Sequence, residues 1–220
     1  MPAAVVFDLD GVLIDSEARW SAAREALVRE SGGRWSDDAP RAMMGMSSPE
    51  WAAYLHDELG VALEPEEIVR AVVARMCDGY RRDGVPFLPG AVEAVRALDG
   101  RWPLGVASSA NREIIDLVLE VGDLAGAFAA TVSSEEVERG KPAPDVYLEA
   151  ARRLGVPAET CVAVEDSTNG LRSAHAAGMA VVAVPNAEYP PDPEAVALAA
   201  VVVDGVGAVT PEVVEQAAAA

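Results

Sequence analysis

The fold of this chain is decided at residues 3–16, which read AAVVFDLDGVLIDS. The stretch begins with a short apolar run, Ala3 to Phe7, which has β-branched residues at its centre and ends at the polar Asp8. Short runs that are apolar at every position are typical of strands buried on both faces of a parallel sheet. Similar runs follow at 104–107, 128–132, 161–164 and 180–184.

Helical patterns lie between these runs. The segment 111–121, for example, places its two isoleucines, Val118 and Leu119 on one helical face. Strand and helix therefore alternate, which predicts an α/β fold with a doubly wound parallel sheet. Further elements are expected as helices at 144–154 and 168–177, an edge strand at 201–203, and a last helix capped by Thr210 with Pro211 at its first position.

The alternation fails in the first third of the chain, where the pattern is helical throughout. Apolar residues at helical spacing predict helices at 17–30, 49–59 and 66–82. A crossover between parallel strands needs little more than about a dozen residues, so this segment is too long to be one. We therefore expect an inserted α-helical cap domain at 16–85, and a catalytic core formed by 1–15 together with 86–220.

Composition narrows the class of protein and its partners. The 220 residues are 51% hydrophobic and 24% charged, which is typical of a globular protein and excludes disordered and fibrous ones. The formal net charge of −19 repels nucleic acids and anionic membranes. The longest apolar stretch, Ala195 to Val203, is far below the about 20 residues of a membrane span. We expect neither nucleic acid nor membrane as a partner, and an anionic substrate would need a local cationic site.

The cysteines favour a reducing compartment. Cys77 and Cys161 form no CxxC pair and no closely spaced framework, so the sequence predicts neither a structural zinc site nor a disulfide scaffold. No basic region precedes the first apolar run, so no export signal is expected. These features together predict a cytoplasmic protein, and they leave its oligomeric state open.

Lys141 is the single lysine in a chain that has 16 arginines. In so arginine-rich a composition, Lys141 is either a residue of a solvated loop or part of a site that needs a compact ammonium group instead of a planar guanidinium. The side chains that lie near it decide between these two interpretations.

Polar side chains follow four of the predicted strands. Ligands of open α/β sheets bind at the carboxyl ends of the strands, so these residues should share one rim. They are Asp8, Asp10 and Gly11 after the first strand, Ser108 and Ser109 after the second, Lys141 after the third, and Glu165 and Asp166 after the fourth. Each alone could serve as a cap or a turn residue. Crowded carboxylates, however, repel one another unless a cation lies between them.

The chemistry that this rim predicts is phosphoryl transfer. Carboxylate oxygens favour Mg²⁺ over zinc, copper or iron, and magnesium commonly keeps waters and a substrate phosphate among its ligands. The hydroxyl groups of Ser108 and Ser109, at the start of a helix, would donate to phosphoryl oxygens, and Lys141 would add positive charge.

At this point the chain resembles the haloacid dehalogenase-like hydrolases. Four motifs carry the resemblance in order: Asp8-Leu9-Asp10-Gly11-Val12, Ser108, Lys141-Pro142-Ala143-Pro144-Asp145, and Glu165-Asp166-Ser167. The match spans the core from Ala4 to about Pro185, and the helical insertion after the first motif resembles the small-cap subgroup, with its phosphatases and β-phosphoglucomutases. The resemblance implies a Rossmann-like core with a mobile lid.

The resemblance also implies roles for single residues. Asp8 looks like the nucleophile that forms an aspartyl-phosphate, and Asp10 like the acid that protonates the leaving oxygen and then activates water. The magnesium ligands would be Asp8, Asp10 through its backbone carbonyl, and Asp166, with Glu165 as a further direct or indirect ligand. The phosphoryl group would be held by Ser108, the backbone N–H of Ser109, and Lys141.

We therefore expect a magnesium-dependent phosphatase for small phosphate monoesters, such as sugar or polyol phosphates. Trp20 stands where the phosphoglucomutase branch usually has histidine, which favours hydrolysis over the alternative, a β-phosphoglucomutase-like sugar phosphate mutase. A dehalogenase is weaker still, because those relatives lack the second aspartate and Asp10 is present here.

Two other interpretations concern the rest of the chain. Receiver domains also combine a strand-end aspartate, a lysine and magnesium, but they are shorter, and their acid pair precedes the phosphorylated aspartate. His56 and His175 are interpreted as structural, since no Gly-x-Ser-x-Gly elbow accompanies them. Cap residues that either pack internally or contact substrate are Glu17, Trp20, Met43, Met44 and Met46.

Overall fold

The computed structural model describes residues 1–43, 46–187 and 189–220. The chain divides into two units, one formed by Met1–Asp15 with Pro86–Ala220 and the other by Ser16–Val85. The first, the sheet unit, holds every strand found in the described part of the chain, and the second, the helical unit, consists of helices and turns.

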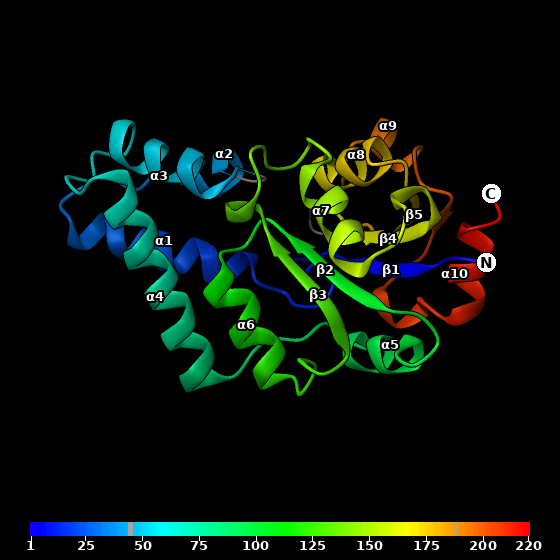
Figure 1. Ribbon diagram of the computed structural model, residues 1–220. Coiled ribbons are helices and arrows are strands. Elements are labelled where there is room, and N and C mark those ends of the chain that lie inside the picture. Colours follow the sequence, from blue (N-terminus) through cyan, green and yellow to red (C-terminus); the bar gives the residue numbers. More distant parts are fainter. Residues whose placement is uncertain (44–45, 188) are drawn as a thin grey trace. The chain divides into compact units, whose positions relative to one another are not determined.

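The sheet unit is built on six parallel strands (Figure 1). They are β1 (Ala4–Phe7), β2 (Leu104–Ser108), β3 (Phe128–Ser133), β4 (Cys161–Glu165), β5 (Ala180–Ala183) and β6 (Val201–Val202). Their spatial order is β3-β2-β1-β4-β5-β6, and every neighbouring pair is parallel. The strand order reverses between β1 and β4, which is the arrangement of Rossmann-like folds. The predicted α/β fold with a doubly wound parallel sheet is confirmed.

Both faces of the central strand are buried. All four side chains of β1 are fully buried, as the apolar run predicts. Because successive strand residues point to opposite faces, Ala4 and Val6 join one apolar cluster while Phe7 lies on the other face. There Phe7 packs edge-on against Phe128, with ring centroids 6.1 Å apart. Because apolar side chains fill both faces of the sheet at β1, polar side chains can gather only at the ends of the strand.

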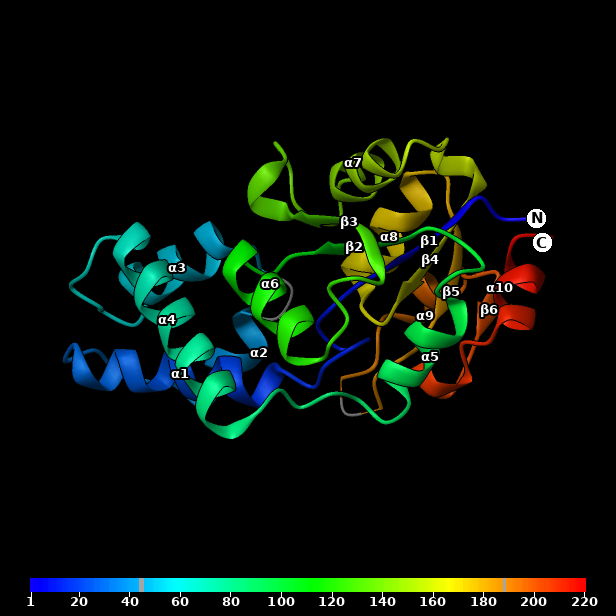
Figure 2. The ribbon, with the colours of Figure 1, turned by 60° about the horizontal axis from the view of Figure 1, so that its bottom comes forward.

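Helices cover the sheet on both sides. They are α5 (Ala91–Leu98), α6 (Arg112–Val121), α7 (Asp145–Leu154), α8 (Thr168–Ala176), α9 (Pro193–Val196) and α10 (Pro211–Ala217), with 3₁₀ turns η1 (Ser134–Glu136), η2 (Ala158–Thr160) and η3 (Val206–Ala208). Figure 1 shows α7 and α8 on one face and α5 and α10 on the other. Figure 2 shows both chain termini at the same end of the sheet unit. The sequence patterns predict α6, α7, α8 and α10 but not the short α5 and α9.

The chain turns tightly after β1. Gly11 has φ +81°, and its N–H donates to the carbonyl oxygen of Ile14 at 2.8 Å. A Cβ on Gly11 would lie 2.0 Å from the Oδ2 atom of Asp166, so only glycine fits this turn beside the end of β4. The N–H of Asp15 then donates to the carbonyl of Pro86 at 2.8 Å, which joins the two segments that lead into and out of the helical unit.

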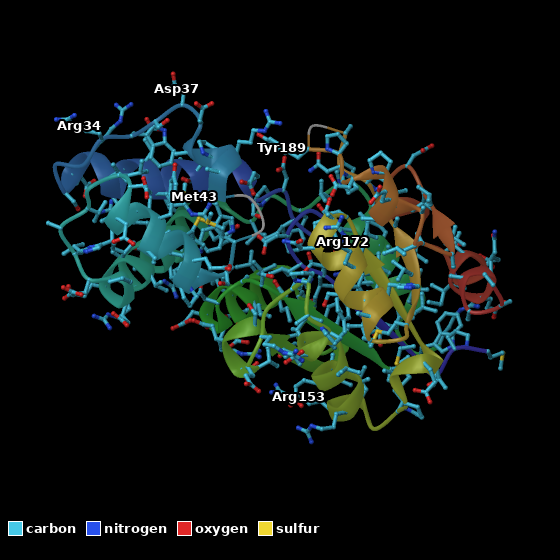
Figure 3. All side chains as sticks on the ribbon, turned by 90° about the horizontal axis from the view of Figure 1, so that it is seen from above. Arg34, Asp37, Met43, Arg153, Arg172 and Tyr189 are labelled. Carbon is cyan, nitrogen blue, oxygen red and sulfur yellow. The ribbon has the colours of Figure 1, made fainter. Side chains whose placement is uncertain are left out.

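The helical unit consists of α1 (Glu17–Glu30), α2 (Ala39–Met43), α3 (Ser48–Asp57) and α4 (Pro65–Asp83). The Arg24 guanidinium lies 5.0 Å from the ring centroid of Trp20 and 4.9 Å from that of Trp51, and both indoles are buried. Met43 is also buried in this unit, and Figure 3 shows it among side chains of the helices, whereas Arg34 and Asp37 lie at the outer margin of the unit. Met44, which the sequence analysis singles out, lies outside the described residues.

Candidate active site

Three acids from β1 and β4 meet at the carboxyl ends of these neighbouring strands. Carboxylate oxygens of Asp8, Glu165 and Asp166 lie within 4.8 Å of one another. The N–H of Asp8 donates to the carbonyl of Val164 at 3.0 Å, which fixes one strand end against the other. All three side chains are buried, so their negative charges are poorly screened by water.

Lys141 lies inside this acid cluster. Its Nζ donates to Oδ1 of Asp8 at 2.9 Å and to Oε1 of Glu165 at 2.5 Å. Its side chain is only 5% exposed, and Nζ lies 5.0 Å from the ring centroid of Tyr147. The interpretation of Lys141 as a solvated loop residue is therefore wrong. The single lysine is a buried point charge between two carboxylates.

Glu165 is saturated with hydrogen-bond donors. Its Oε1 accepts from Lys141 Nζ and from the hydroxyl of Tyr147, which lies 2.9 Å away. Its Oε2 accepts from the backbone N–H groups of Asp166 at 3.0 Å and Ser167 at 3.2 Å, and from the Ser167 hydroxyl at 3.2 Å. Glu165 therefore anchors Lys141 and the start of α8, which partly fits the capping role considered for it.

Space for this carboxylate comes from a glycine in the first turn of α8. The N–H of Gly170 donates to Oγ of Ser167, the N-cap residue, at 3.1 Å. A Cβ on Gly170 would lie 1.8 Å from Oε1 of Glu165. Any larger residue would force the Glu165 carboxylate away from Lys141.

The cluster carries an excess of negative charge. With all three acids ionised, one ammonium group would leave two negative charges uncompensated. Burial raises the pKa of Asp8 to about 7, with Lys141 opposing this shift and Glu165 and Asp10 adding to it. Burial likewise raises the pKa of Asp166, helped by Glu165 and Asp8. Burial opposes the charge on Lys141, but the two carboxylates that it contacts raise its pKa, so it remains an ammonium group.

This excess fits a divalent cation. Oδ1 of Asp166 is buried and accepts no hydrogen bond from any residue that the structure describes. It lies in the same cluster as the Asp8 carboxylate, and both supply the hard oxygen ligands that magnesium prefers. Asp8 and Asp166 could therefore hold a metal ion, whereas the oxygens of Glu165 are already occupied.

Ser108 lies at the end of β2, opposite Ser133 of β3 in the register of the sheet. It is fully buried, and its Oγ accepts the N–H of Ala110 at 3.0 Å. The helix that follows has Asn111 as its N-cap residue, so neither Ser108 nor Ser109 occupies the N-cap position that the sequence analysis considered for them. Ser108 and Ser109 instead form the turn that leads into α6.

Asp10 lies in the turn after β1 and is partly exposed. Its backbone forms an isolated bridge with Ile14. Among the described residues, its side chain does not belong to the carboxylate cluster of Asp8, Glu165 and Asp166. A position beside the buried cluster suits a group that exchanges protons with a bound molecule.

Three residues of this region are absent from the sequence-based set. Tyr147 contacts Lys141 and Glu165, but its position on the apolar face of α7 makes it indistinguishable from a core residue in the sequence. Asn111 and Glu135 bond to each other, Nδ2 to Oε1 at 2.6 Å, across two loops. Only the pairing of β2 with β3 brings those loops together.

The sequence of this chain matches a known protein family and known enzymes. A family model described as haloacid dehalogenase-like hydrolase matches residues 5–184. Hexitol phosphatase B of Escherichia coli (strain K12) is 36% identical over 200 residues, which cover 86% of each chain. Fructose-1-phosphate phosphatase YqaB of the same organism is 33% identical over 184 residues, which cover 83% of this chain and 96% of that protein.

Solved structures show the same fold. The crystal structure of CbbY from Rhodobacter sphaeroides in complex with phosphate superposes with a TM-score of 0.88, covering 98% of this chain and 100% of that chain. Its sequence identity is 24%, so this likeness concerns the fold alone. Within the described residues, none of the helices combines the length and the apolar character that crossing a lipid bilayer requires.

Proposed function

This chain belongs to the haloacid dehalogenase-like hydrolases, and we propose that it hydrolyses small phosphate monoesters through an aspartyl-phosphate on Asp8. It is a phosphoric monoester hydrolase. The observation that carries the proposal is the buried Lys141, held between Asp8 and Glu165 in the cluster that also contains Asp166. The ammonium group of Lys141 beside the Asp8 carboxylate, together with a cation held by the acid cluster, would offset the repulsion between this carboxylate and a phosphate dianion.

The substrates are small phosphorylated metabolites, with sugar and polyol phosphates as the first candidates. Two relatives that match most of the chain are phosphatases named for a hexitol and for fructose 1-phosphate. The high negative charge of the whole chain disfavours nucleic acids as substrates.

The reaction proceeds in two displacements. The Asp8 carboxylate attacks phosphorus while the bond from phosphorus to the ester oxygen breaks, and Asp10 gives its proton to the departing alcohol. Asp10 then takes a proton from a water molecule, which attacks the phosphorus of the aspartyl-phosphate and releases inorganic phosphate and the Asp8 carboxylate. Lys141 keeps its proton throughout and compensates the charge of the transferring group.

Ser108 and Ser109 bind the phosphoryl oxygens. Because Oγ of Ser108 accepts the N–H of Ala110, its own O–H is directed elsewhere and can donate to a phosphoryl oxygen. The Ser109 N–H, in the same turn, is the second donor.

Asp8, Asp166 and the backbone carbonyl of Asp10 would hold the metal ion, which we propose to be Mg²⁺. Support comes from the three acids crowded around one ammonium group, and from the buried Oδ1 of Asp166, which accepts no hydrogen bond among the described residues. When bound, the ion supplies positive charge that lets the phosphoryl group approach Asp8.

The two units divide these tasks. Residues 1–15 and 86–220 carry the chemistry, and 16–85 act as a cap that limits access of water and of substrates. We place the hinge of this cap at the two connecting segments, which are joined by the hydrogen bond between Asp15 and Pro86. A cytoplasmic location is supported by Cys77 and Cys161, both of them buried thiols.

The test is release of inorganic phosphate from a panel of hexitol, hexose, pentose and nucleoside monophosphates, with Mg²⁺ and with a chelator. We expect magnesium-dependent release that differs among the esters in kcat/KM. A parallel incubation with β-glucose 1-phosphate and a trace of glucose 1,6-bisphosphate follows glucose 6-phosphate and phosphate together. Accumulation of glucose 6-phosphate much faster than phosphate would establish the mutase instead.

A further inference from the structure

A second loop holds the turn that we assign to phosphate binding. We call residues 108–111, between β2 and α6, the phosphate loop, and Ser133–Glu135, at the end of β3, the clamp. The clamp belongs to the segment before Lys141, and no step of the proposed reaction uses it. Four side-chain hydrogen bonds nevertheless join the clamp to the phosphate loop and to the first residue of α6.

Glu135 makes two of these bonds at the start of α6. Its Oε1 accepts from Nδ2 of Asn111 at 2.6 Å, and its Oε2 accepts from the N–H of Arg112 at 3.1 Å. Asn111 is the N-cap residue and is only 1% exposed. Oε2 of Glu135 therefore accepts from the N–H of the first residue of α6, one of the four N–H groups at a helix start that have no partner within the helix.

The two serines fix the peptide groups of the phosphate loop. The hydroxyl of Ser133 donates to the carbonyl of Ala110 at 2.7 Å, and that of Ser134 donates to the carbonyl of Ser109 at 3.2 Å. Each carbonyl belongs to a rigid peptide plane, so these bonds also set the directions of the N–H groups of Ala110 and Asn111. The Ser109 N–H is thus confined between strand β2 and a fixed peptide group.

Hydrogen bonds with α6, α7 and Glu136 hold the end of β3, on which the clamp lies. Arg153 of α7, labelled in Figure 3, donates to the carbonyl of Thr131 in β3 at 2.8 Å. Arg112 donates to Oγ1 and the carbonyl of the same threonine, at 2.6 Å and 3.0 Å, and also to Glu136. The N–H of Ser133 donates to Oε2 of Glu136 at 2.9 Å. The clamp therefore transmits the position of β3 to the phosphate loop.

We propose that Glu135, with Ser133 and Ser134, is a positioning residue that preorganises the phosphate loop for the transferring phosphoryl group. This inference rests on the proposed function, because it assumes that Ser108 and Ser109 bind phosphate. Donors that are held in place before binding lose no conformational freedom when the phosphoryl group arrives.

Charge makes the proposal easy to distinguish from a simple electrostatic effect. Glu135 is negative and lies close to the loop that receives an anion, so its charge alone weakens phosphate binding. Removal of that charge by Glu135→Gln would then tighten binding. As a positioning residue, Glu135 has the opposite effect, because a glutamine amide accepts through one oxygen and turns an NH₂ group toward the second donor.

The experiment compares Glu135→Gln with Glu138→Gln, which removes the same charge from an exposed residue of the same segment. The readout is the inhibition constant of inorganic phosphate, measured with kcat and KM well below the melting temperature. Since charge-assisted hydrogen bonds are involved, we expect this constant to rise about tenfold in Glu135→Gln and to stay the same or fall in Glu138→Gln. KM should rise more than kcat falls, and the Mg²⁺ dependence should stay unchanged.

A second pair of variants, with smaller changes, tests the proposal in case Glu135→Gln does not fold. Ser134→Ala removes the donor to Ser109, whereas Ser134→Thr keeps a hydroxyl, so we expect weaker phosphate binding in the first and recovery in the second. Hydrogen exchange supplies a readout that does not need activity. The amides of Ala110 and Asn111 should exchange faster in Glu135→Gln and at the parent rate in Glu138→Gln.

The outcomes separate the two proposals. If the parent enzyme releases phosphate and Glu135→Gln binds phosphate as Glu138→Gln does, the clamp has no positioning role. If the parent enzyme releases no phosphate from any ester, the proposed function fails, and faster exchange in Glu135→Gln would then show a clamp that serves folding alone.

Discussion

The sheet unit and the helical unit each bury a cationic side chain, but one is surrounded by carboxylates and the other by indole rings. In the sheet unit, Lys141 is bonded to two carboxylates and lies against a third acid, Asp166. In the helical unit, the Arg24 guanidinium is stacked on the rings of Trp20 and Trp51. A cation between carboxylates balances charge for a reaction, whereas a cation between indoles is held by packing.

This difference indicates that the chemistry of the molecule is carried out in the sheet unit. The ends of β1 and β4 bring the carboxyl groups of Asp8, Glu165 and Asp166 close together. Their mutual repulsion destabilises the fold, and a bound cation would offset it. No corresponding acid cluster occurs among the described residues of the helical unit. We therefore expect substitutions in the sheet unit to change turnover strongly, and those in the helical unit to change stability or selectivity.

The largest effect is expected for Asp8→Asn. Asparagine still accepts a hydrogen bond from Lys141 but forms no acyl phosphate, so turnover should fall on the order of 10⁴-fold or more. The melting temperature without metal should stay the same or rise, because the substitution removes one of three crowded carboxylates. Turnover at a tenth of the parent rate would remove Asp8 as nucleophile.

Lys141→Arg should have the next largest effect. The charge is kept, but the larger guanidinium must fit a buried space bounded by Asp8, Glu165 and the Tyr147 ring. The loss of a positioned donor at the transferring group predicts a fall in kcat/KM of about a hundredfold. Arg172→Lys, at an exposed position of α8, is the matched control and should leave kcat/KM unchanged. Equal kcat/KM in Lys141→Arg and the parent would show that any cation serves there.

Gly170→Ala tests the same cluster without replacing any charged residue. The new Cβ would lie 1.8 Å from Oε1 of Glu165 and must displace that carboxylate. We expect a loss of about 1–3 kcal/mol in the free energy of unfolding, as for other overpacked positions, and about a tenfold fall in kcat/KM. Gly126→Ala is the control in the same unit, because a Cβ there meets nothing within 4 Å.

If both alanine variants unfold at the same denaturant concentration and retain parent kcat/KM, the Glu165 carboxylate is free to move. Its bond to Lys141 would then not be needed for turnover. That result would weaken the conclusion that the acid cluster of the sheet unit determines turnover.

The centre of the sheet could be predicted because β1, β2 and β4 are buried at every position. The run at 104–107 is apolar throughout, and β2 spans Leu104–Ser108. Helices α5 and α9 are not predicted because eight and four residues show too few turns for a helical period, whereas the seven-residue α10 is marked by Thr210 and Pro211 at its start. Long amphipathic patterns are legible in one sequence, and short ones are not.

The site could be predicted only where strand ends carry charged groups. Asp8, Lys141, Glu165 and Asp166 were expected on one rim, and the structure brings them together. Tyr147 was not expected, because an aromatic residue on the apolar face of a helix has the same pattern whether it packs in a core or donates to a carboxylate. The contacts of Glu135 depend on loop geometry, which has no period in the sequence.

The smallest effect on turnover is expected for Trp20→Phe in the helical unit. Trp20 is 7% exposed, its ring centroid lies 6.1 Å from that of Trp51, and the Arg24 guanidinium lies over its face. Phenylalanine keeps an aromatic face but leaves a gap, so the free energy of unfolding should fall by about 1 kcal/mol. Because the residues that we propose as reacting groups belong to the sheet unit, kcat/KM should stay within about threefold of the parent. Thermal unfolding and turnover, measured on the same preparation, separate the two effects. A loss of kcat/KM greater than about tenfold with an unchanged melting temperature would place the Trp20 ring against the substrate, and the division of labour between the two units would then be wrong.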